Sequence, residues 1–382
     1  MSAPARAADG VDVVVVGAGV VGLASAAALA SAGRGVVVLE RAARIATATT
    51  SRNSGVLHAG LYYPPGSLAA HACVEGRALT VARCRERGID WRETGKLVVA
   101  CAPDEVPRLE ALAANARACG APDVELVDAA FASAREPHVR AVAALWSPRT
   151  GIVDAVGLAA SFAAEAEASG AACLTSREVV GLARTRDGWR VDVREPDGAR
   201  GAIAALAVVD AAGLEADRVA ALAGIDVDAA GLRLHPCKGS YFALAPGAPL
   251  AFRGLVYPLP AGGGLGVHAT LDLGGRVRFG PDAEYVAPEA RDDVRVDPAK
   301  AAAFARAIAR YAPGIREEWL APDDAGVRPK LAGPGEPFRD FVVREESAHG
   351  APGFVSCVGI ESPGLTAAAS LARRVAALLA SL

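Results

Sequence analysis

The chain has 382 residues, of which 52% are apolar and 22% are charged, and its formal net charge is −3. This length and composition predict two domains or one large one, and they exclude a disordered chain or a small disulfide-stapled scaffold. With 40 basic and 43 acidic residues, the chain lacks the basic surplus of a sequence-independent nucleic-acid binder. Its seven cysteines have no CxxC spacing, which argues against a disulfide framework and a zinc ribbon and indicates a reducing, cytoplasmic setting.

Residues 11–40 read VDVVVVGAGVVGLASAAALASAGRGVVVLE and predict a strand, a glycine-rich turn, a helix and a second strand. The β-branched run at 11–16 is typical of a buried parallel strand, and the small residues that continue to Ala32 predict a helix. A second β-branched strand at 36–39 ends at Glu40. The alternative, a buried apolar hairpin with accidental glycines, leaves Glu40 unexplained. The residues that precede this unit do not show the basic start and apolar core of a signal peptide, so none is expected.

The turn between the first strand and the helix is a GxGxxG motif made by Gly17, Gly19 and Gly22. The first glycine permits the tight turn, the second lets the backbone approach a pyrophosphate, and the third lets the helix pack closely. The helix N-terminus presents unpaired N–H groups to the phosphates, and Glu40 can accept hydrogen bonds from an adenosine ribose. These residues predict dinucleotide binding, but the motif alone does not distinguish FAD from NAD.

Later segments indicate which dinucleotide is bound. Residues 47–63, TATTSRNSGVLHAGLYY, form a polar excursion where a simple NAD-binding domain would continue into another strand and helix, and a helix is expected over 67–87. The run AVVDAAG at 207–213 predicts an apolar strand that returns beside the first one. Phe354–Val358 predicts a further strand, and the turn GIESPGLT at 359–366 and a C-terminal helix follow it.

Together these segments resemble the D-amino-acid-oxidase-like superfamily of FAD-dependent oxidoreductases, and within it the L-2-hydroxyglutarate oxidase/dehydrogenase family. The resemblance spans residues 11–366 in the family's order. It is carried by SRNSGVLHAGLYYPPGSL (51–68), GKLVVA (95–100), HPCKGSYF (235–242), LVYPLP (255–260), GVH (266–268), VRFGPDAE (277–284) and GVRPKL (326–331). The best-known members carry an N-A-P-S-P-A-A-T-like turn where this chain has GIESPGLT, so its substrate or electron acceptor could differ.

The resemblance implies an α/β fold in which a Rossmann-like FAD-binding domain is interleaved with an α+β substrate domain built on an antiparallel sheet. The FAD-binding domain is expected at 1–88, 145–225 and 326–382, and the substrate-binding domain at 89–144 and 226–325. The residues themselves agree in outline. Short strands with Gly and Pro turns are expected over 232–285, and a helix over 298–312.

The resemblance also implies that FAD is bound by the glycine turn, the end of the second strand, the polar loop and the later turns. The residues expected to bind it are Gly17, Ala18, Gly19, Val20, Val21, Gly22, Glu40, Arg41, Thr50, Ser51, Arg52, Asn53, Ser54, Val179, Ala211, Ala212, Gly213, Gly359, Pro363, Gly364, Leu365 and Thr366.

Oxidation of a 2-hydroxy acid needs a base for the hydroxyl proton and cations or donors for the carboxylate. His58 is the first candidate for the base because it follows the SRNSG loop, which the resemblance places beside the isoalloxazine. Its alternative roles are to contact the flavin or to hold the loop. His268 is the second candidate, since it lies on a strand expected to line the substrate cavity, and its alternative role is a hydrogen bond within the sheet.

Arg328 is the candidate for the substrate carboxylate, because a guanidinium can donate two parallel hydrogen bonds to it. Its alternative role is a salt bridge near the cofactor. Lys238 and Lys330 stand out in a chain that uses few lysines, and either could bind a second carboxylate or be an ordinary surface or interdomain cation. Tyr257 could donate to a carboxylate, pack on the flavin, or simply fill the core.

The expected function is therefore FAD-dependent oxidation of an L-2-hydroxy acid to the 2-oxo acid by hydride transfer to flavin N5, with L-2-hydroxyglutarate as the substrate. The alternative is a different 2-hydroxy acid or an amino acid. A second GxGxxG and a redox CxxC or CxxxxC are both missing, so the flavin is expected to be reoxidised by oxygen, a quinone or another carrier. The expected location is cytoplasmic, with peripheral contact to the inner membrane if the acceptor is a quinone.

No catalytic metal is expected, because no His, Cys and carboxylate cluster has metal-ligand spacing. Two other classes of function stay open. A tRNA-modifying flavoprotein also begins with GxGxxG but needs a basic RNA-binding face. A non-catalytic dinucleotide-binding or assembly protein would show no turnover with any acid.

Overall fold

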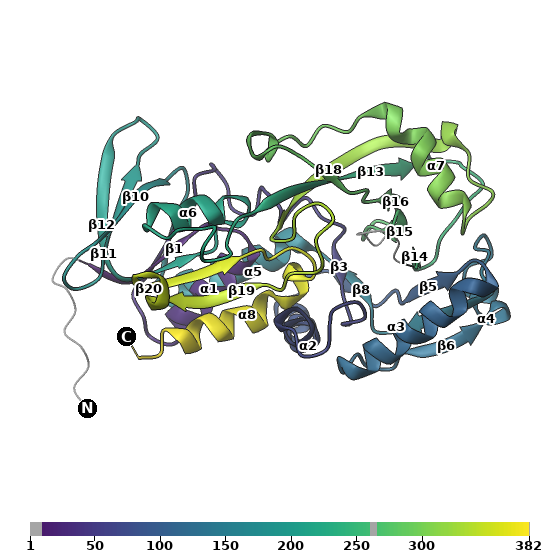
Figure 1. Ribbon diagram of the computed structural model, residues 1–382, viewed down its shortest axis with the longest axis horizontal. Helices are drawn as coiled ribbons and strands as arrows, with labels where there is room; N and C mark the ends of the chain where they lie inside the picture. Colours follow the sequence, from purple (N-terminus) through teal and green to yellow (C-terminus); the bar gives the residue numbers. More distant parts are fainter. Residues whose placement is uncertain (1–9, 260–265, 382) are drawn as a thin grey trace. The chain divides into compact units, whose positions relative to one another are not determined.

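The computed structural model describes residues 10–259 and 266–381 and divides the chain into two compact units (Figure 1). The first unit contains the chain up to Ser51, Ala155–His235 and the chain from Pro329 onward, and the second contains Arg52–Asp154 and Pro236–Arg328. Both units are therefore discontinuous. The first division falls well before residue 88, so residues 52–88 pack within the second unit. The assignment of FAD binding and substrate binding to separate domains stays a prediction at this point.

The first unit is built on a sheet whose central strands run in the order β9-β2-β1-β12-β20 and are all parallel. This is the 3-2-1-4-5 order of a Rossmann-like sheet. The residues of its strands are mostly apolar and β-branched, which is typical of a parallel sheet whose two faces are both covered by helices. The bounds are β1 Val11–Val16, β2 Val36–Leu39, β9 Ala172–Leu174, β12 Arg200–Asp210 and β20 Ala351–Val358.

Antiparallel strands extend this parallel sheet. Strands β10 and β11 form an antiparallel meander with the first part of β12, and β19 pairs antiparallel with β20. These strands are β10 Glu178–Arg184, β11 Trp189–Arg194 and β19 Val342–Glu346. The ring of Trp189 lies 5.8 Å from that of Phe354, centroid to centroid, in a core cluster that includes Val14 and Val16.

Helix α1 packs between α5 and α8 on one face of this sheet, and α6 packs on the other face against β10, β12 and β20 (Figure 1). The close packing of α1 follows from its composition, since most of its residues are Ala, Gly or Ser and nine of its twelve are buried. The bounds are α1 Val20–Ser31, α5 Ala155–Ala168, α6 Ala216–Leu222 and α8 Gly364–Leu378.

The second unit contains a larger sheet in the order β17-β13-β16-β15-β14-β5-β7-β6, with β18 paired to β13. The pairs along this order are antiparallel except for the parallel pair β14–β5. The bounds are β5 Lys96–Ala100, β6 Glu125–Asp128, β7 Ala143–Ser147, β13 His235–Leu244, β14 Leu255–Pro258, β15 His268–Leu271, β16 Val277–Gly280, β17 Glu284–Tyr285 and β18 Leu320–Lys330.

Helices cover this sheet and complete its core. On α7 the ring of Phe304 lies 4.7 Å from that of Phe242 on β13, and α3 packs on β5 and β7. A small antiparallel sheet, β3-β8-β4, lies elsewhere in the same unit. The remaining bounds are α2 Leu68–Arg87, α3 Val106–Ala118, α4 Ala129–Arg135, α7 Ala301–Ala309, β3 Val56–Leu57, β4 Trp91–Arg92 and β8 Gly151–Val153.

The structure confirms the expected fold class, a Rossmann-like α/β unit interleaved with an α+β unit that is built mainly on antiparallel strands. The strand expected at 207–213 is the end of a longer one, β12, which lies in the sheet beside the strand-turn-helix segment of residues 11–40 as predicted and pairs in parallel with β1. The helix expected over 298–312 is shorter, because a 3-10 turn at Pro298–Lys300 precedes α7. Within the described ranges, no helix combines the length and the apolar character needed to cross a bilayer.

A buried carboxylate ties the end of α4 to the start of β14. Glu136 is 3% exposed, and its oxygens accept hydrogen bonds from the backbone N–H groups of Arg253 (3.0 and 3.1 Å) and Gly254 (2.6 Å). Glu136→Ala leaves these N–H groups without acceptors, so we expect the free energy of unfolding to fall by about 1–3 kcal/mol. Thermal denaturation followed by circular dichroism measures this loss. The control is Glu110→Ala on the exposed face of α3, and equal melting temperatures for the two variants would contradict the assignment.

Candidate functional site

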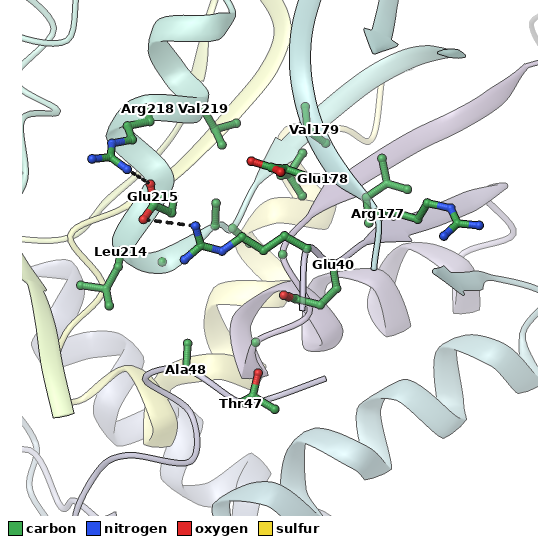
Figure 2. Close-up of a pocket in the computed structure, with 18 of the residues that line it drawn as sticks. Glu40, Thr47, Ala48, Arg177, Glu178, Val179, Leu214, Glu215, Arg218 and Val219 are labelled. Atoms are coloured by element: carbon green, nitrogen blue, oxygen red, sulfur yellow. Dashed lines mark hydrogen bonds and ion pairs between the residues drawn. The ribbon is translucent and has the colours of Figure 1, made fainter. Parts of the chain in front are cut away.

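A pocket of about 460 Å³ opens at the carboxyl ends of β1, β2 and β12 in the first unit. Its lining comes from the turn after β1, the end of β2, residues 46–50, the start of β10 and residues 211–222. Figure 2 shows Glu40, Thr47 and Val179 among the residues around it. The carboxyl edge of a parallel sheet is where such folds bind their ligands, because the strand order reverses there.

The three glycines of the GxGxxG motif shape this pocket in different ways. Gly17 has φ +100°, and a Cβ there would lie 2.6 Å from the carbonyl oxygen of Ala211. A Cβ on Gly22 would lie 2.0 Å from the carbonyl oxygen of Gly17. Gly17 and Gly22 therefore allow β1, β12 and α1 to meet. Gly19 lines the pocket, and a Cβ there would meet only the hydroxyl oxygen of Thr50 at 3.3 Å.

Two side chains hold the turn in place. The carboxylate of Glu40 accepts hydrogen bonds from the backbone N–H groups of Ala18 and Ala42, both at 2.8 Å. The hydroxyl of Thr50 accepts one from the N–H of Val20, the first residue of α1, at 3.0 Å. A carboxylate has about four acceptor positions, so Glu40 can still accept from a ribose in the pocket that it lines.

Nine of the residues expected to bind the cofactor line this pocket. They are Gly17, Gly19, Glu40, Arg41, Thr50, Val179, Ala211, Ala212 and Gly213. Ala18, Val20, Val21 and Gly22 belong to the turn and to the first residues of α1. Ser51, Gly359, Pro363, Gly364, Leu365 and Thr366 lie in the first unit outside this lining, and Arg52, Asn53 and Ser54 lie in the second unit. For the residues outside the lining, contact with the cofactor stays a prediction.

The pocket also contains charged residues that the sequence analysis missed. Glu215 is paired with Arg218 at 2.8 Å (Figure 2). It is also paired with Arg41 at 3.5 Å. The backbone N–H of Arg177 donates to the carbonyl of Glu40 at 2.8 Å, and Arg177 lines the pocket just after β9. The rule that ligands bind at the carboxyl ends of parallel strands could have indicated Arg177, had the strand at 172–174 been recognised.

In the second unit, a cluster of aromatic and basic side chains contains the buried Lys96, Tyr257 and His268 and the half-buried Tyr62. The rings of Tyr257 and His268 stack with centroids 3.7 Å apart and planes 11° apart, and the ring of Tyr62 lies 6.4 Å from that of Tyr257. The Nζ of Lys96 lies 4.7 Å from the Tyr62 centroid and 4.6 Å from the Tyr257 centroid. Lys96 is 0% exposed and His268 is 2% exposed. The structure thus brings together two predicted residues, Tyr257 and His268, and adds Lys96 and Tyr62.

Both candidate base histidines are held neutral. Burial lowers the pKa of His268 to about 3, with further lowering by the charges of Lys96 and Arg328, and the carbonyl of Gly266 opposes this shift. Burial also lowers the pKa of His58 well below its ordinary value, and the charges of Lys96 and His268 add to that effect. A neutral imidazole can accept a proton, which is what a general base requires.

Three polar atoms of this cluster have no hydrogen-bond partner within the described part of the chain. They are the hydroxyl of Tyr62, the Nζ of Lys96 and the Nε2 of His268. An unsatisfied buried polar group costs about 1–3 kcal/mol. Their gathering in one place therefore indicates a site for a polar ligand, since a ligand can supply the missing partners.

Arg328 is oriented by the backbone of its own unit. Its Nη2 donates to the carbonyl oxygen of Asp282 at 2.9 Å and lies 3.3 Å from the Cys237 sulfur. Lys238 pairs with Asp293 at 3.4 Å. Because adjacent side chains of a strand point to opposite faces, Lys238 lies on the other face of β13 from the Cys237 thiol that Arg328 contacts. The structure therefore does not bring Lys238 to Arg328.

In the first unit, Lys330 donates to the carboxylate of Glu361 at 2.5 Å, and both side chains are less than one fifth exposed. Glu361 belongs to the GIESPGLT turn. This ion pair neutralises a lysine that could otherwise bind a second substrate carboxylate. Elsewhere in the described ranges, His, Cys, Asp and Glu side chains form no group of three that could hold a metal ion.

Comparison with known proteins identifies the family. The model of the FAD dependent oxidoreductase family matches residues 12–378. The chain belongs to this family. The oxidoreductase is 38% identical to the mitochondrial L-2-hydroxyglutarate dehydrogenase of Arabidopsis thaliana over 97% of this chain and 83% of that protein. It is 37% identical to the human protein of the same name over 71% of this chain, but the match spans only 60% of the human protein's length.

Solved structures share the fold of this chain. The oxidoreductase superimposes on the FAD-bound L-α-glycerophosphate oxidase of Mycoplasma pneumoniae with a TM-score of 0.87 and 27% identity, covering 97% of this chain and 95% of that one. Glycine oxidase from Geobacillus kaustophilus follows with a TM-score of 0.79 and 25% identity, at 97% and 95% coverage. The predicted FAD cofactor is thereby confirmed.

The pocket of the first unit fits this cofactor. Gly19 leaves the space that a Cβ would fill, at the N-terminus of the twelve-residue helix α1, and this arrangement suits a pyrophosphate. Glu40 directly follows β2, at the position suited to the adenosine ribose. These residues of the oxidoreductase would hold the ADP portion of FAD.

The glycines make distinct predictions for the oxidoreductase. Gly22→Ala places a methyl group against the Gly17 carbonyl, so we expect both the FAD content and the melting temperature of the apoprotein to fall. Gly19→Ala should leave the apoprotein melting temperature within about a degree and weaken FAD binding at least about tenfold, or 1.4 kcal/mol. Fluorescence titration with FAD and differential scanning fluorimetry measure these effects.

The control for both variants is Gly314→Ala, because a Cβ at Gly314 would meet no atom within 4 Å. Unchanged FAD affinity in Gly19→Ala would contradict the placement of the pyrophosphate. Unchanged stability in Gly22→Ala would contradict the close contact between the start of α1 and the turn.

Proposed function

We propose that this oxidoreductase converts an L-2-hydroxy acid to the 2-oxo acid, with L-2-hydroxyglutarate as substrate and 2-oxoglutarate as product. The Arabidopsis and human relatives, whose names specify this substrate, support the proposal. The structural observation that carries it is the buried cluster of the second unit, in which a neutral imidazole and unpartnered polar atoms lie together.

The reaction removes a proton from the substrate hydroxyl and a hydride from Cα. Bound FAD supplies the hydride acceptor. The chain supplies the base, and neutral His58 or His268 accepts the hydroxyl proton. Arg328, held by the carbonyl of Asp282, binds the substrate carboxylate through charge-assisted hydrogen bonds. The burial of the cluster excludes water, which strengthens these electrostatic interactions.

The electron acceptor that reoxidises the flavin and the location of the protein belong to the same proposal. We propose oxygen, a quinone or a carrier protein as the acceptor, and a cytoplasmic location, with peripheral contact to the inner membrane if a quinone is used. Adding air or a soluble quinone to the reduced protein distinguishes the acceptors by the rate at which the yellow colour returns.

A second candidate substrate is a different 2-hydroxy acid or an amino acid. The observation that favours it is the pair between Lys330 and Glu361, because it removes one cation that a dicarboxylic acid could use. A monocarboxylic substrate has a single carboxylate, which Arg328 alone can bind. Comparing L-2-hydroxyglutarate with monocarboxylic 2-hydroxy acids and amino acids therefore separates the two candidates.

The test is anaerobic addition of L-2-hydroxyglutarate to the FAD-loaded protein, followed by the absorbance of the oxidised flavin. We expect bleaching with the L-enantiomer and none with the D-enantiomer. Bleaching by another acid or an amino acid alone would support the second candidate. Bleaching by none of these compounds would contradict the proposed reaction.

His58→Gln tests the first base candidate. Loss of a general base lowers the rate constant by about 10²–10⁴, and we expect the rate of flavin reduction to fall in this range while FAD remains bound. Stopped-flow absorbance measures that rate. The matched control is His71→Gln, since His71 is an exposed residue of α2. A wild-type rate in His58→Gln, combined with a loss in His268→Gln, would transfer the role to His268.

A further inference from the structure

Lys96 is the first residue of β5, and the fold buries it completely. Strand β5 lies beside β14, which carries Tyr257, and β14 lies beside β15, which begins with His268 (Figure 1). The backbone of Lys96 pairs with Leu255 across the parallel pair of strands. The register of the sheet therefore places the lysine, Tyr257 and His268 in one layer of neighbouring strands.

The ammonium group of Lys96 lies close to two aromatic rings. Its Nζ is 4.7 Å from the centroid of Tyr62 and 4.6 Å from that of Tyr257, and those rings are 6.4 Å apart with planes 18° apart. Both distances are typical of cation–π contacts. The Nζ has no hydrogen-bond partner within the described residues. Aromatic faces are thus the principal contacts that stabilise this buried charge.

The titratable groups around Lys96 come from every element packed on it. Cys73 of α2 raises the pKa of Lys96 and so partly opposes the effect of burial. Burial raises the pKa of the Cys73 thiol itself to about 12. Tyr62 and Tyr257 remain protonated because burial raises the pKa of each hydroxyl. His58 and His268 both experience the Lys96 charge, and Arg328 also acts on His268. Burial lowers the pKa of Lys96 itself to about 7.

A lysine in this position is not explained by stability. Removing a lone ammonium from water is costly, and replacing a buried charge with an apolar side chain of similar length is often neutral or stabilising. Lys96 does, however, place a positive charge near His58 and His268, and this charge lowers the pKa of each imidazole in addition to the effect of burial. Its consequence is electrostatic, because like charge opposes protonation of an imidazole.

We propose that Lys96 is a positioning residue of the proposed oxidation: in contact with the rings of Tyr62 and Tyr257, it supports the ring on which His268 stacks, and its charge adds to burial in keeping His58 and His268 neutral. Both histidines are thereby neutral before the substrate binds, which a proton acceptor requires, and the charge of Lys96 lowers the basicity of each. This inference rests on the proposed function for its catalytic meaning, but the effect of Lys96 on the histidines is a property of the chain alone.

The sign of the effect follows from the charges. Lys96→Met removes a positive charge, so the pKa values of both histidines rise toward the ordinary value. The neutral imidazole then forms only at higher pH, and the acid limb of the kcat/KM profile moves upward by about one pH unit. Because the wild-type lysine loses its own proton near pH 7, the two proteins should converge above that pH.

The first experiment is a histidine NMR titration of the full-length, FAD-loaded protein. Wild type, Lys96→Met and Lys96→Arg are labelled with [¹⁵N]histidine and followed from pH 2 to pH 8, a range that includes the pKa of about 3 of His268. We expect the signals of His58 and His268 to titrate at higher pH in Lys96→Met, and Lys96→Arg to restore the wild-type curves because it keeps the charge. The matched control is Lys300→Met in the same unit, since Lys300 instead pairs with Asp282 and Glu284.

Identical histidine titrations in wild type and Lys96→Met would overturn the inference. An increase in KM without any shift in the histidine signals would also overturn it, because it would make Lys96 a substrate ligand. If no hydroxy acid reduces the flavin but the titrations shift as expected, the proposed function fails and the electrostatic role of Lys96 stands.

A stability measurement keeps the proposal testable if NMR assignment is incomplete. The folded protein disfavours the charged lysine, so the destabilisation by Lys96 is absent above pH 10.5, increases as pH falls from 10.5 to about 7 and is complete below that. Lys96→Met should therefore melt higher than wild type at pH 6 by several degrees, and the difference should shrink by pH 10. A lower melting temperature for Lys96→Met at both pH values would show that the lysine stabilises the fold and would contradict the proposal.

Discussion

The first unit depends on the close approach of three backbone segments at the start of α1. Gly17 turns the chain beside the carbonyl of Ala211, and Gly22 brings the helix onto the carbonyl of Gly17. A side chain at either glycine would separate β1, β12 and α1. Because these elements meet, the carboxyl ends of the central strands lie at one edge, where Glu40 and the helix N-terminus form the cofactor pocket.

The second unit is organised by a different constraint, the burial of basic groups in an aromatic environment. Lys96 and His268 are nearly inaccessible to solvent, and Tyr257 contacts both. Burial penalises every charge placed there, so imidazoles stay neutral and phenols stay protonated. Such a cluster favours proton transfer from a bound substrate over exchange with water. The chemistry of FAD belongs to the cofactor, whereas the protonation state of its partners is set by this packing.

The sequence predicted the first unit better than the second, for a physical reason. From residue 11 to Glu40 the strand, turn and helix follow one another directly, so the local pattern contains most of the information. The return of β12 beside β1 was predicted from the apolar run that ends in AAG. Arg177 and Glu215 were missed because they reach the pocket only through the sheet order, which the local pattern does not contain.

In the second unit the sequence identified His58, Tyr257 and His268 through the resemblance, but it did not single out Lys96. The scarcity of lysine and its place at the start of the apolar run KLVVA were the available signals. Its contacts with Tyr62 and Tyr257 depend on strands far apart in the chain. The pair between Lys330 and Glu361 is likewise a contact between distant segments, and the local pattern left open whether Lys330 binds a carboxylate of the substrate or is an ordinary cation.

The most direct test of the account is the deuterium isotope effect on flavin reduction in a single turnover. The FAD-loaded protein is mixed anaerobically with L-2-hydroxyglutarate that carries either hydrogen or deuterium at Cα, across a range of pH. The account predicts that deuterium slows the bleaching several-fold, and that the rate rises with pH through one ionisation well below pH 6.5. Bleaching without an isotope effect at any pH, or no bleaching, would contradict hydroxy-acid oxidation with a histidine that is already neutral.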